Sequence, residues 1–364
     1  MEAMRPKERL LAAITGKNPD RVPWSPFLAY YWDFVDEQTR QGGEYAFLKK
    51  IGADPLLRGS HTLFNPVRKH CDVTQKQEGK YRLTIYETPV GRLEEVHTFA
   101  PSSNTWFLTR HPVSCENDVK ILQYIYENTE IAPNLSAFEK DWKTYGDDAL
   151  LLPVIGTELK TAMQSLVEHW FGTVELVYGL EDYPAAIEEC LGVMRRRNLE
   201  TVRISAGSSA ECFLFYEDSS TTNLSPALFE RYTLPEIAEW SRLLHRNNKL
   251  LIHHACGHIR DLLRLMANSG IDAIESIAPP PTGNVSISDA FAALPDSVAL
   301  IGGIEPTILL NSTMEELKAY TVNLLCSAAG HRYVLANSDS CPPHVEEDKF
   351  RMISSLVRNF PSLM

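Results

Sequence analysis

Strand-like and helix-like segments alternate along the chain from about residue 150 to residue 336. The predicted strands are short apolar runs typical of buried strands, at 150–156, 211–216, 250–252, 271–277, 298–301 and 332–336. Between them, apolar residues recur at helical spacing over 159–168, 174–179, 184–198, 228–247, 259–268, 288–293 and 314–329. Such alternation is typical of a parallel sheet in an α/β protein. With about eight strand candidates, it favours a single closed (β/α)8 TIM barrel.

Two further segments flank or interrupt that pattern. An N-terminal extension contains a predicted helix at 6–16, a turn at 18–21 and a first apolar stretch at 22–31. The segment 81–99 alternates polar and apolar residues around Thr88-Pro89-Val90-Gly91, which predicts an antiparallel β-hairpin inserted outside the main repeat. A chain of 364 residues with 44% hydrophobic residues can bury one large core, so we expect one domain over 1–364.

The charge, the apolar runs and the cysteines of the chain limit its partners and its cellular location. The formal net charge of -12 argues against nucleic acid and anionic membrane surfaces, which need clustered Lys and Arg. No apolar run approaches the length of a membrane span. The seven cysteines are odd in number and scattered, and the N-terminus has no apolar core of a signal peptide. These features predict a cytoplasmic protein without a disulfide framework.

A histidine and a cysteine end the predicted strand that starts at Leu250. His254 and Cys256 are two residues apart, so in an extended strand they lie on the same side, about 7 Å apart. An imidazole and a thiolate suit zinc, whose catalytic sites keep three protein ligands and one exchangeable position. Cys341 follows another predicted strand and completes the candidate set. Alternatively, these are ordinary buried core residues, because Cys is among the most buried residue types.

Carboxylates also follow the predicted strands. In a barrel of this kind the chemistry lies at the carboxyl ends of the strands, so these side chains become candidates for one common rim. Each one is alternatively a helix cap or a solvated loop residue. The candidates are Glu217, Asp218, Glu275, Glu305 and Asp339.

Several segments in a fixed order resemble the uroporphyrinogen decarboxylase superfamily. They are Glu8-Arg9-Leu10-Leu11-Ala12-Ala13 with Pro19-Asp20-Arg21-Val22-Pro23, Tyr216-Glu217-Asp218 with Leu224-Ser225-Pro226, His254-Ala255-Cys256-Gly257, Gly270-Ile271-Asp272-Ala273, Gly302-Gly303-Ile304-Glu305-Pro306 and Cys341-Pro342-Pro343. The similarity covers most of the chain and is weak from about Asp36 to Leu150.

Within this superfamily, the sequence resembles the zinc-dependent methyltransferases that work with corrinoid proteins. Decarboxylase members hold their polyanionic substrate with an arginine-rich segment, but residues 26–32 (PFLAYYW) contain no arginine. The methyltransferases instead carry H-x-C and a distant cysteine, and Cys341 lies 85 positions after Cys256 (341 minus 256). The resemblance therefore implies zinc held by His254, Cys256 and Cys341.

The same resemblance implies the reaction and its partners. A methyl group would move between a small methylated compound, or a thiol acceptor, and the cobalt of a corrinoid carried on a separate protein. Zinc would activate the thiol or polarise the methylated heteroatom. This chain has no cobalamin-binding Asp-x-His-x-x-Gly segment of its own. The aromatic residues at positions 24–32 hint at a methoxylated aromatic substrate, although core packing explains them equally well.

The remaining candidates have supporting roles. Glu217 or Glu275 would occupy the fourth zinc position or orient the substrate, and Asp218 and Asp339 would hydrogen-bond the zinc-bound histidine or the substrate. For His253 and His258 we expect helix capping or surface exposure. Two other functions stay open on the same barrel: a metal-free decarboxylase of the porphyrinogen type, and a non-catalytic protein that binds a small molecule.

Overall fold

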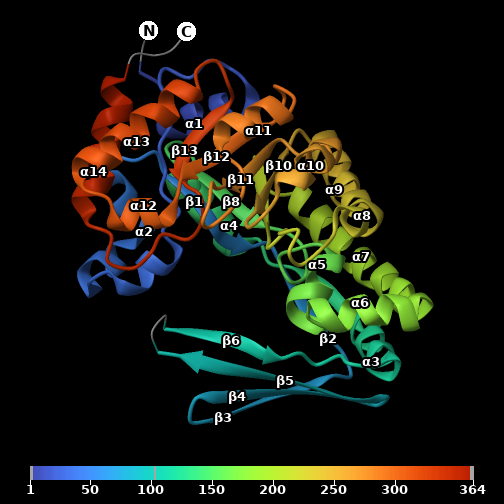
Figure 1. Cartoon of the computed structure of the whole chain (residues 1–364). Helices are drawn as coiled ribbons and strands as arrows, with labels where there is room; N and C mark the ends of the chain where they lie inside the picture. Colours follow the sequence, from blue (N-terminus) through green and yellow to red (C-terminus); the bar gives the residue numbers. More distant parts are fainter. Residues whose placement is uncertain (1–2, 102–103, 361–364) are drawn as a thin grey trace. The chain divides into compact units, whose positions relative to one another are not determined.

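The computed structural model describes residues 3–101 and 104–360. The chain forms two compact units (Figure 1). Unit 1 comprises residues 1–62, 135–154 and 206–364, and unit 2 comprises residues 63–134 and 155–205. Within the described ranges, no helix combines the length and the apolar character needed to cross a bilayer.

A seven-stranded parallel sheet forms the core of unit 1. Its strands follow the order β1-β8-β9-β10-β11-β12-β13, so each strand after β8 adds next to the previous one. This arrangement confirms the predicted parallel α/β sheet. The bounds are β1 Leu56–Thr62, β8 Leu150–Val154, β9 Cys212–Glu217, β10 Leu250–Ala255, β11 Ala273–Ile277, β12 Ala299–Ile304 and β13 Tyr333–Asn337.

The first apolar stretch lies beside β13 but forms only an isolated bridge, between Trp24 and Leu335. The Ser25 amide donates to the Leu335 carbonyl at 3.0 Å, and the Leu335 amide donates to the Pro23 carbonyl at 2.9 Å. Pro23 and Pro26 flank this bridge and have no N–H group, so they cannot extend the hydrogen-bond ladder. The sheet is therefore seven regular strands with one extended segment at its edge, and the complete eight-stranded barrel remains a prediction.

Helices of unit 1 lie outside the sheet (Figure 1). Several begin at side-chain caps: Ser286 and Thr313 accept hydrogen bonds from amides of the first turns of α11 and α13. The bounds are α1 Pro6–Thr15, η1 Ala29–Phe34, α2 Glu37–Ile51, α4 Ser136–Tyr145, α8 Pro226–Leu228, η3 Phe229–Thr233, α9 Leu234–Arg246, η4 Arg260–Leu262, α10 Leu263–Asn268, α11 Ile287–Ala293, α12 Pro306–Asn311, α13 Met314–Ser327 and α14 Glu347–Asn359.

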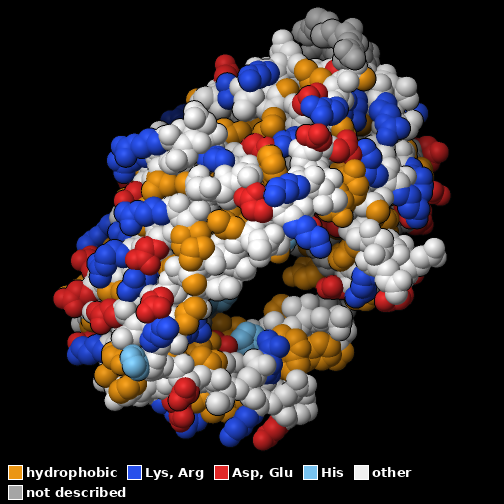
Figure 2. All heavy atoms as spheres, turned by 180° about the vertical axis from the view of Figure 1, so that it is seen from behind, with side chains coloured by type: hydrophobic (Ala, Val, Ile, Leu, Met, Phe, Trp, Pro, Cys, Tyr) orange, Lys and Arg blue, Asp and Glu red, His pale blue; other side chains and the backbone are white. Residues whose placement is uncertain are grey.

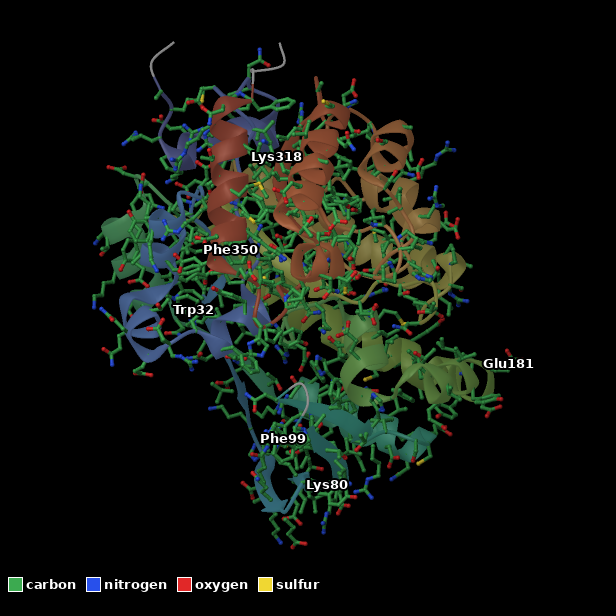
Figure 3. The ribbon with its side chains drawn as sticks, turned by 60° about the vertical axis from the view of Figure 1, so that its left-hand side comes forward. Trp32, Lys80, Phe99, Glu181, Lys318 and Phe350 are labelled. Atoms are coloured by element: carbon green, nitrogen blue, oxygen red, sulfur yellow. The ribbon has the colours of Figure 1, made fainter. Side chains whose placement is uncertain are left out.

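The aromatic residues near the N-terminus differ in burial. Trp24 is fully buried. Tyr31 packs against Phe350 of α14 with ring centroids 5.2 Å apart, and Trp32 packs against Phe47 at 5.8 Å. Figure 3 labels Trp32 and Phe350 on these elements. The core alternative of the sequence analysis therefore holds for Trp24, whereas Tyr31 and Trp32 are half-buried and Tyr30 is exposed.

Unit 2 contains two antiparallel sheets and several helices. The sheets are β2 Phe64–Arg68 with β7 Thr129–Pro133, and the ordered set β3 Asp72–Glu78, β4 Tyr81–Thr88, β5 Gly91–Ala100 and β6 Thr105–Arg110. The expected hairpin corresponds to β4 and β5, which pair from Tyr81 with Thr98 to Thr88 with Gly91. Its role as an insertion into a barrel remains a prediction. Figure 3 labels Lys80 and Phe99 in this region. The helices are α3 Glu116–Glu127, α5 Ala162–Ser165, η2 Leu166–Trp170, α6 Thr173–Asp182 and α7 Pro184–Ala206.

Charged side chains of both signs are interspersed on the face drawn in Figure 2. Acidic and basic side chains alternate there with hydrophobic ones.

Candidate active site

The candidate site of unit 1 lies at the carboxyl ends of β9, β10 and β11. His254 is in register with Tyr216 of β9 and with Glu275 of β11, so the three side chains project on one face of the sheet. The His254 ring centroid is 5.0 Å from that of Tyr216 and 5.5 Å from that of Phe27. His254 thus packs against two aromatic rings and is only 5% exposed.

A carboxylate fixes the orientation of the His254 ring. Glu275 Oε2 lies 3.1 Å from His254 Nδ1, and Arg58 Nε donates to Glu275 Oε1. Because an ionised carboxylate only accepts hydrogen bonds, it favours a proton on Nδ1 and leaves the Nε2 lone pair available. Burial alone would raise the pKa of Glu275, but the Arg58 charge and the His254 hydrogen bond lower it to about 2.

Arg58 is a site residue that the sequence analysis missed. Its guanidinium also donates to the carbonyls of Ser25 at 3.2 Å, Pro26 at 3.2 Å and Leu56 at 3.4 Å. Its cation lies 5.6 Å from the centre of the Phe27 ring. The available signal was an arginine directly after the apolar Leu56-Leu57 pair, at the start of a strand that the sequence analysis did not identify.

Cys256 follows β10 and lies in an open pocket of about 380 Å³, which we call the mouth pocket. Asp218 and Asp339 also line this pocket, together with Thr282. The Cys256 amide donates to the Glu217 carbonyl at 3.1 Å, which holds the thiol at the end of the strand. The mouth pocket therefore combines one thiol with two carboxylates from three different strand ends.

Cys341 takes a different position from Cys256. Its amide donates to the Phe27 carbonyl at 2.9 Å, and its carbonyl accepts from the Tyr31 amide at 3.0 Å. The side chain is fully buried, its Sγ donates to the Pro342 carbonyl at 3.6 Å, and burial raises the pKa of its thiol well above the ordinary value. Cys341 does not line the mouth pocket.

The described residues contain no group of three His, Cys, Asp or Glu side chains placed to hold a metal ion. His254 and Cys256 share one strand end, but the structure does not bring Cys341 to them as a third donor. The donor types do fit zinc, since an imidazole with thiolates is a common ligand set. Zinc binding by His254, Cys256 and Cys341 therefore remains a proposal, which the donor types of these side chains support.

Glu217 lies apart from His254. It is in register with Ala255, and its side chain is bound by His253 Nε2 at 3.0 Å and by the Ser219 hydroxyl at 3.2 Å. The side chains of Glu217 and His253 are both fully buried. The expectation that His253 caps a helix or lies at the surface is therefore wrong, because His253 occupies an interior strand position and is stacked on Phe215 at 4.3 Å. His258 is exposed.

The other rim carboxylates have local partners. Asp218 accepts a hydrogen bond from the Asn223 side chain at 2.7 Å, and Asp339 Oδ1 accepts from the Ser340 amide at 2.6 Å. Glu305 caps α12 by accepting from the Ile308 amide at 2.9 Å, which is the helix-cap alternative of the sequence analysis. The carboxylate that hydrogen-bonds to His254 is that of Glu275.

Comparisons with known proteins agree with this arrangement. Residues 161–360 match the model of the family described as uroporphyrinogen decarboxylase (URO-D). Over 345 residues the chain is 25% identical to the methylcobamide:CoM methyltransferase MtbA of Methanosarcina mazei, covering 91% of both proteins. A solved structure of a methyltransferase from Methanosarcina mazei aligns with 98% of this chain and 99% of its own, with a TM-score of 0.65 and 12% identity. The predicted resemblance is therefore confirmed: the chain belongs to the uroporphyrinogen decarboxylase family, on the side of its corrinoid-linked methyltransferases.

Proposed function

We propose that this protein is a methyltransferase that moves a methyl group between a small methylated compound, or a thiol acceptor, and the cobalt of a corrinoid carried on a separate protein. The observation that carries the proposal is the similarity to a methylcobamide:CoM methyltransferase over 91% of both chains. The His254 and Cys256 pair at one strand end supports it, because both are donors of the type that zinc enzymes use.

His254, Cys256 and Cys341 are the residues that would hold the zinc ion. When bound, zinc would lower the pKa of a substrate thiol or polarise a methylated heteroatom. The carboxylate of Asp339 competes with Cys341 for the third place, since it shares the mouth pocket with Cys256 and zinc also accepts carboxylate oxygen.

The remaining residues of the site position these donors and the substrate. Glu275 holds His254 in the tautomer with a free Nε2, and Arg58 keeps the carboxylate ionised. We assign Asp218 and Asp339 to orient the small substrate, because both line the mouth pocket beside the Cys256 thiol. The mouth pocket beside Cys256 is open to solvent, as access by a corrinoid on another protein requires.

Two assays on the purified full chain test the proposal. Elemental analysis should find about one zinc per chain, and methylcobalamin with a thiol such as coenzyme M, the acceptor in the relative's name, should lose its methyl group to the thiol. Cys256→Ser should lose both zinc and transfer. Cys326→Ser, at an exposed cysteine on α13, is the matched control and should retain both. Absence of zinc together with unchanged transfer in Cys256→Ser would refute the proposal.

A decarboxylase of the porphyrinogen type is the second candidate. Its substrate needs several free cations, and Arg58 is already bound to Glu275 and three backbone carbonyls. We therefore expect no loss of carboxyl groups when uroporphyrinogen is incubated with the protein. A non-catalytic binding protein, the third candidate, would bind a small molecule tightly without any turnover of methylated corrinoid.

A further inference from the structure

A second cavity lies at the opposite edge of the sheet in unit 1. It measures about 660 Å³, and we call it the basal cavity. Val298 and Arg332, which line it, directly precede β12 and β13, whereas the mouth pocket lies beyond the strand ends. Because barrel chemistry uses the carboxyl ends of the strands, methyl transfer does not explain a cavity at the amino ends.

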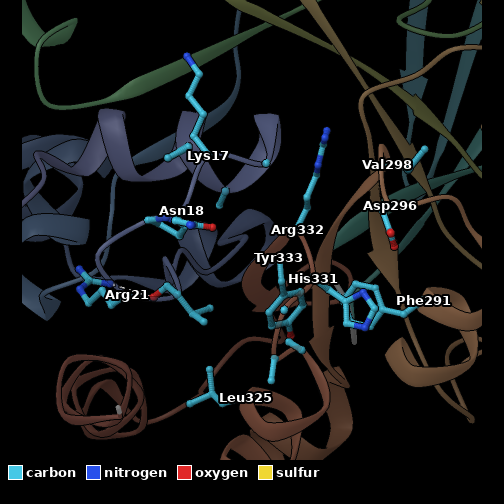
Figure 4. Close-up of a pocket in the computed structure, with 18 of the residues that line it drawn as sticks. Lys17, Asn18, Arg21, Phe291, Asp296, Val298, Leu325, His331, Arg332 and Tyr333 are labelled. Carbon is cyan, nitrogen blue, oxygen red and sulfur yellow. Dashed lines mark hydrogen bonds between the residues drawn. The ribbon is translucent and has the colours of Figure 1, made fainter. Parts of the chain in front are cut away.

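The floor of the basal cavity is apolar. Leu325, Tyr333 and Val357 contribute to its lining and are at most 2% exposed. The Tyr333 hydroxyl donates to the Gly302 carbonyl at 2.7 Å, so its polar atom is already occupied. Phe291 stacks on His331 with ring centroids 4.1 Å apart and forms one wall (Figure 4). This floor favours the apolar body of a ligand.

Cations from different parts of the chain lie around this floor. Figure 4 shows Lys17, from the turn after α1, and Arg332, from the start of β13, both drawn at the same cavity. Neither makes an ion pair with any residue in the described ranges, and Arg332 donates one hydrogen bond, to the Ser297 carbonyl at 2.8 Å. Asp296 is the carboxylate of the lining, while Arg21 is bound to Asp54 at 2.8 Å. The lining thus has two cations that form no ion pair among the described residues, against one carboxylate, in a chain with a net charge of -12.

The Arg332 guanidinium packs closely against Gly16. A Cβ atom added at Gly16 would lie 2.4 Å from Arg332 Nε, so the close approach of the guanidinium requires glycine there. Gly16 also has φ +74, in the left-handed region that favours glycine. The guanidinium therefore lies against Gly16 at the C-terminal end of α1, and Gly16 and Arg332 both line the cavity.

We propose that the basal cavity binds a small organic anion whose apolar body contacts Leu325, Tyr333 and Phe291 and whose carboxylate or phosphate group contacts Lys17 and Arg332. The volume is in the range of small-molecule sites, and the combination of an apolar lining with a few convergent polar groups is typical of them. Guanidinium and ammonium groups bind such anions through charge-assisted hydrogen bonds. This site is separate from the one proposed for methyl transfer and does not depend on it.

Two fluorescent probes of similar shape test the charge and the cavity separately. Anilinonaphthalene sulfonate carries an anionic group, and phenylnaphthylamine has the same type of ring system without it. The double variant Lys17→Gln/Arg332→Gln should weaken binding of the sulfonate by about tenfold and leave binding of the neutral probe within about twofold. Lys318→Gln, an exposed lysine of α13 outside the cavity lining, is the matched control and should change neither.

A cavity-blocking variant locates the probe. Ala329 lines the cavity from an exposed position at the end of α13, so Ala329→Trp should fill its entrance and weaken both probes without disturbing the core. Circular dichroism checks that each variant is folded. Sulfonate binding that survives in Ala329→Trp, or equal weakening of both probes in the double variant, would overturn the proposal.

Discussion

The buried ion pair between Arg58 and Glu275 makes the clearest prediction about stability. The two side chains are 1% and 2% exposed, and Glu275 also binds His254. Glu275→Gln keeps the size of the side chain but removes its charge. Arg58 would then remain as a buried cation without a counter-charge, which is the costly way to break a buried pair.

The magnitude follows from the pKa of Glu275. Its pKa is lowered from the ordinary 4.5 to about 2, which corresponds to about 3 kcal/mol in favour of the ionised form in the folded state. Removing one partner of a buried pair typically costs about 3–5 kcal/mol. We therefore expect Glu275→Gln to lower the free energy of unfolding by about 3 kcal/mol at pH 7.

The contribution of Glu275 to the free energy of unfolding changes with pH in a definite direction. A depressed carboxyl pKa stabilises the folded state at pH values above 4.5, and this stabilisation is lost as the pH falls toward 2. Wild type should therefore lose more stability than Glu275→Gln when the pH is lowered through this window. The difference between the two proteins should be largest near neutral pH.

Urea unfolding, followed by circular dichroism and by tryptophan fluorescence, measures these changes. The single variants Glu275→Gln and Arg58→Met and their double variant form a cycle, and we expect the double variant to recover part of the loss. Glu347→Gln is the matched control, because Glu347 forms ion pairs with Lys50 and Arg351 while 30% exposed, and it should cost less than about 1 kcal/mol. The reasoning is wrong if Glu275→Gln costs no more than this control.

Three further predictions concern the metal, a second carboxyl group and a turn. If Cys341 is the third zinc ligand, Cys341→Ser should lose zinc in elemental analysis while Asp339→Asn retains it; the reverse result would assign that place to Asp339. Burial raises the pKa of Glu44 to about 7, partly offset by Arg58, so the folded state should lose stability as the pH rises from about 4.5 to about 7. Because Glu44 is partly exposed, we expect Glu44→Gln to be more stable than wild type at pH 8 by only about 1–2 kcal/mol, measured by urea unfolding. Gly16→Ala should destabilise the protein by about 1 kcal/mol or more, seen as a lower melting temperature, because φ is +74 and the new Cβ would meet a guanidinium; an unchanged melting temperature would contradict that assignment.

Much of the central sheet was predictable from local sequence. The apolar runs at 150–156, 211–216 and 332–336 correspond to β8, β9 and β13 within about two residues at either end. Strands buried on both faces need continuous apolar segments, and such segments can be recognised in the amino-acid sequence. For the same reason, the placement of His254 and Cys256 at the end of one strand followed from their spacing.

The partners of those residues depended on tertiary structure. Arg58 and Glu275 are separated by 217 positions, and no periodicity links two residues so far apart. The buried pair of His253 with Glu217 was likewise absent from the sequence analysis, which had expected helix capping or surface exposure for His253. Strand pairing decides these contacts, because parallel register determines which side chains become neighbours.

The sequence by itself therefore determined the parallel α/β sheet and the family, through apolar runs and short motifs that are local properties. Tertiary structure alone decided that Cys341 is buried beside Phe27 and Tyr31 while Asp339 faces the same pocket as Cys256. The physical reason lies in the turn after β13, where Asp339 and Cys341 are close neighbours in the sequence. The backbone of this turn directs the Cys341 side chain into the core and the Asp339 side chain into the open mouth pocket.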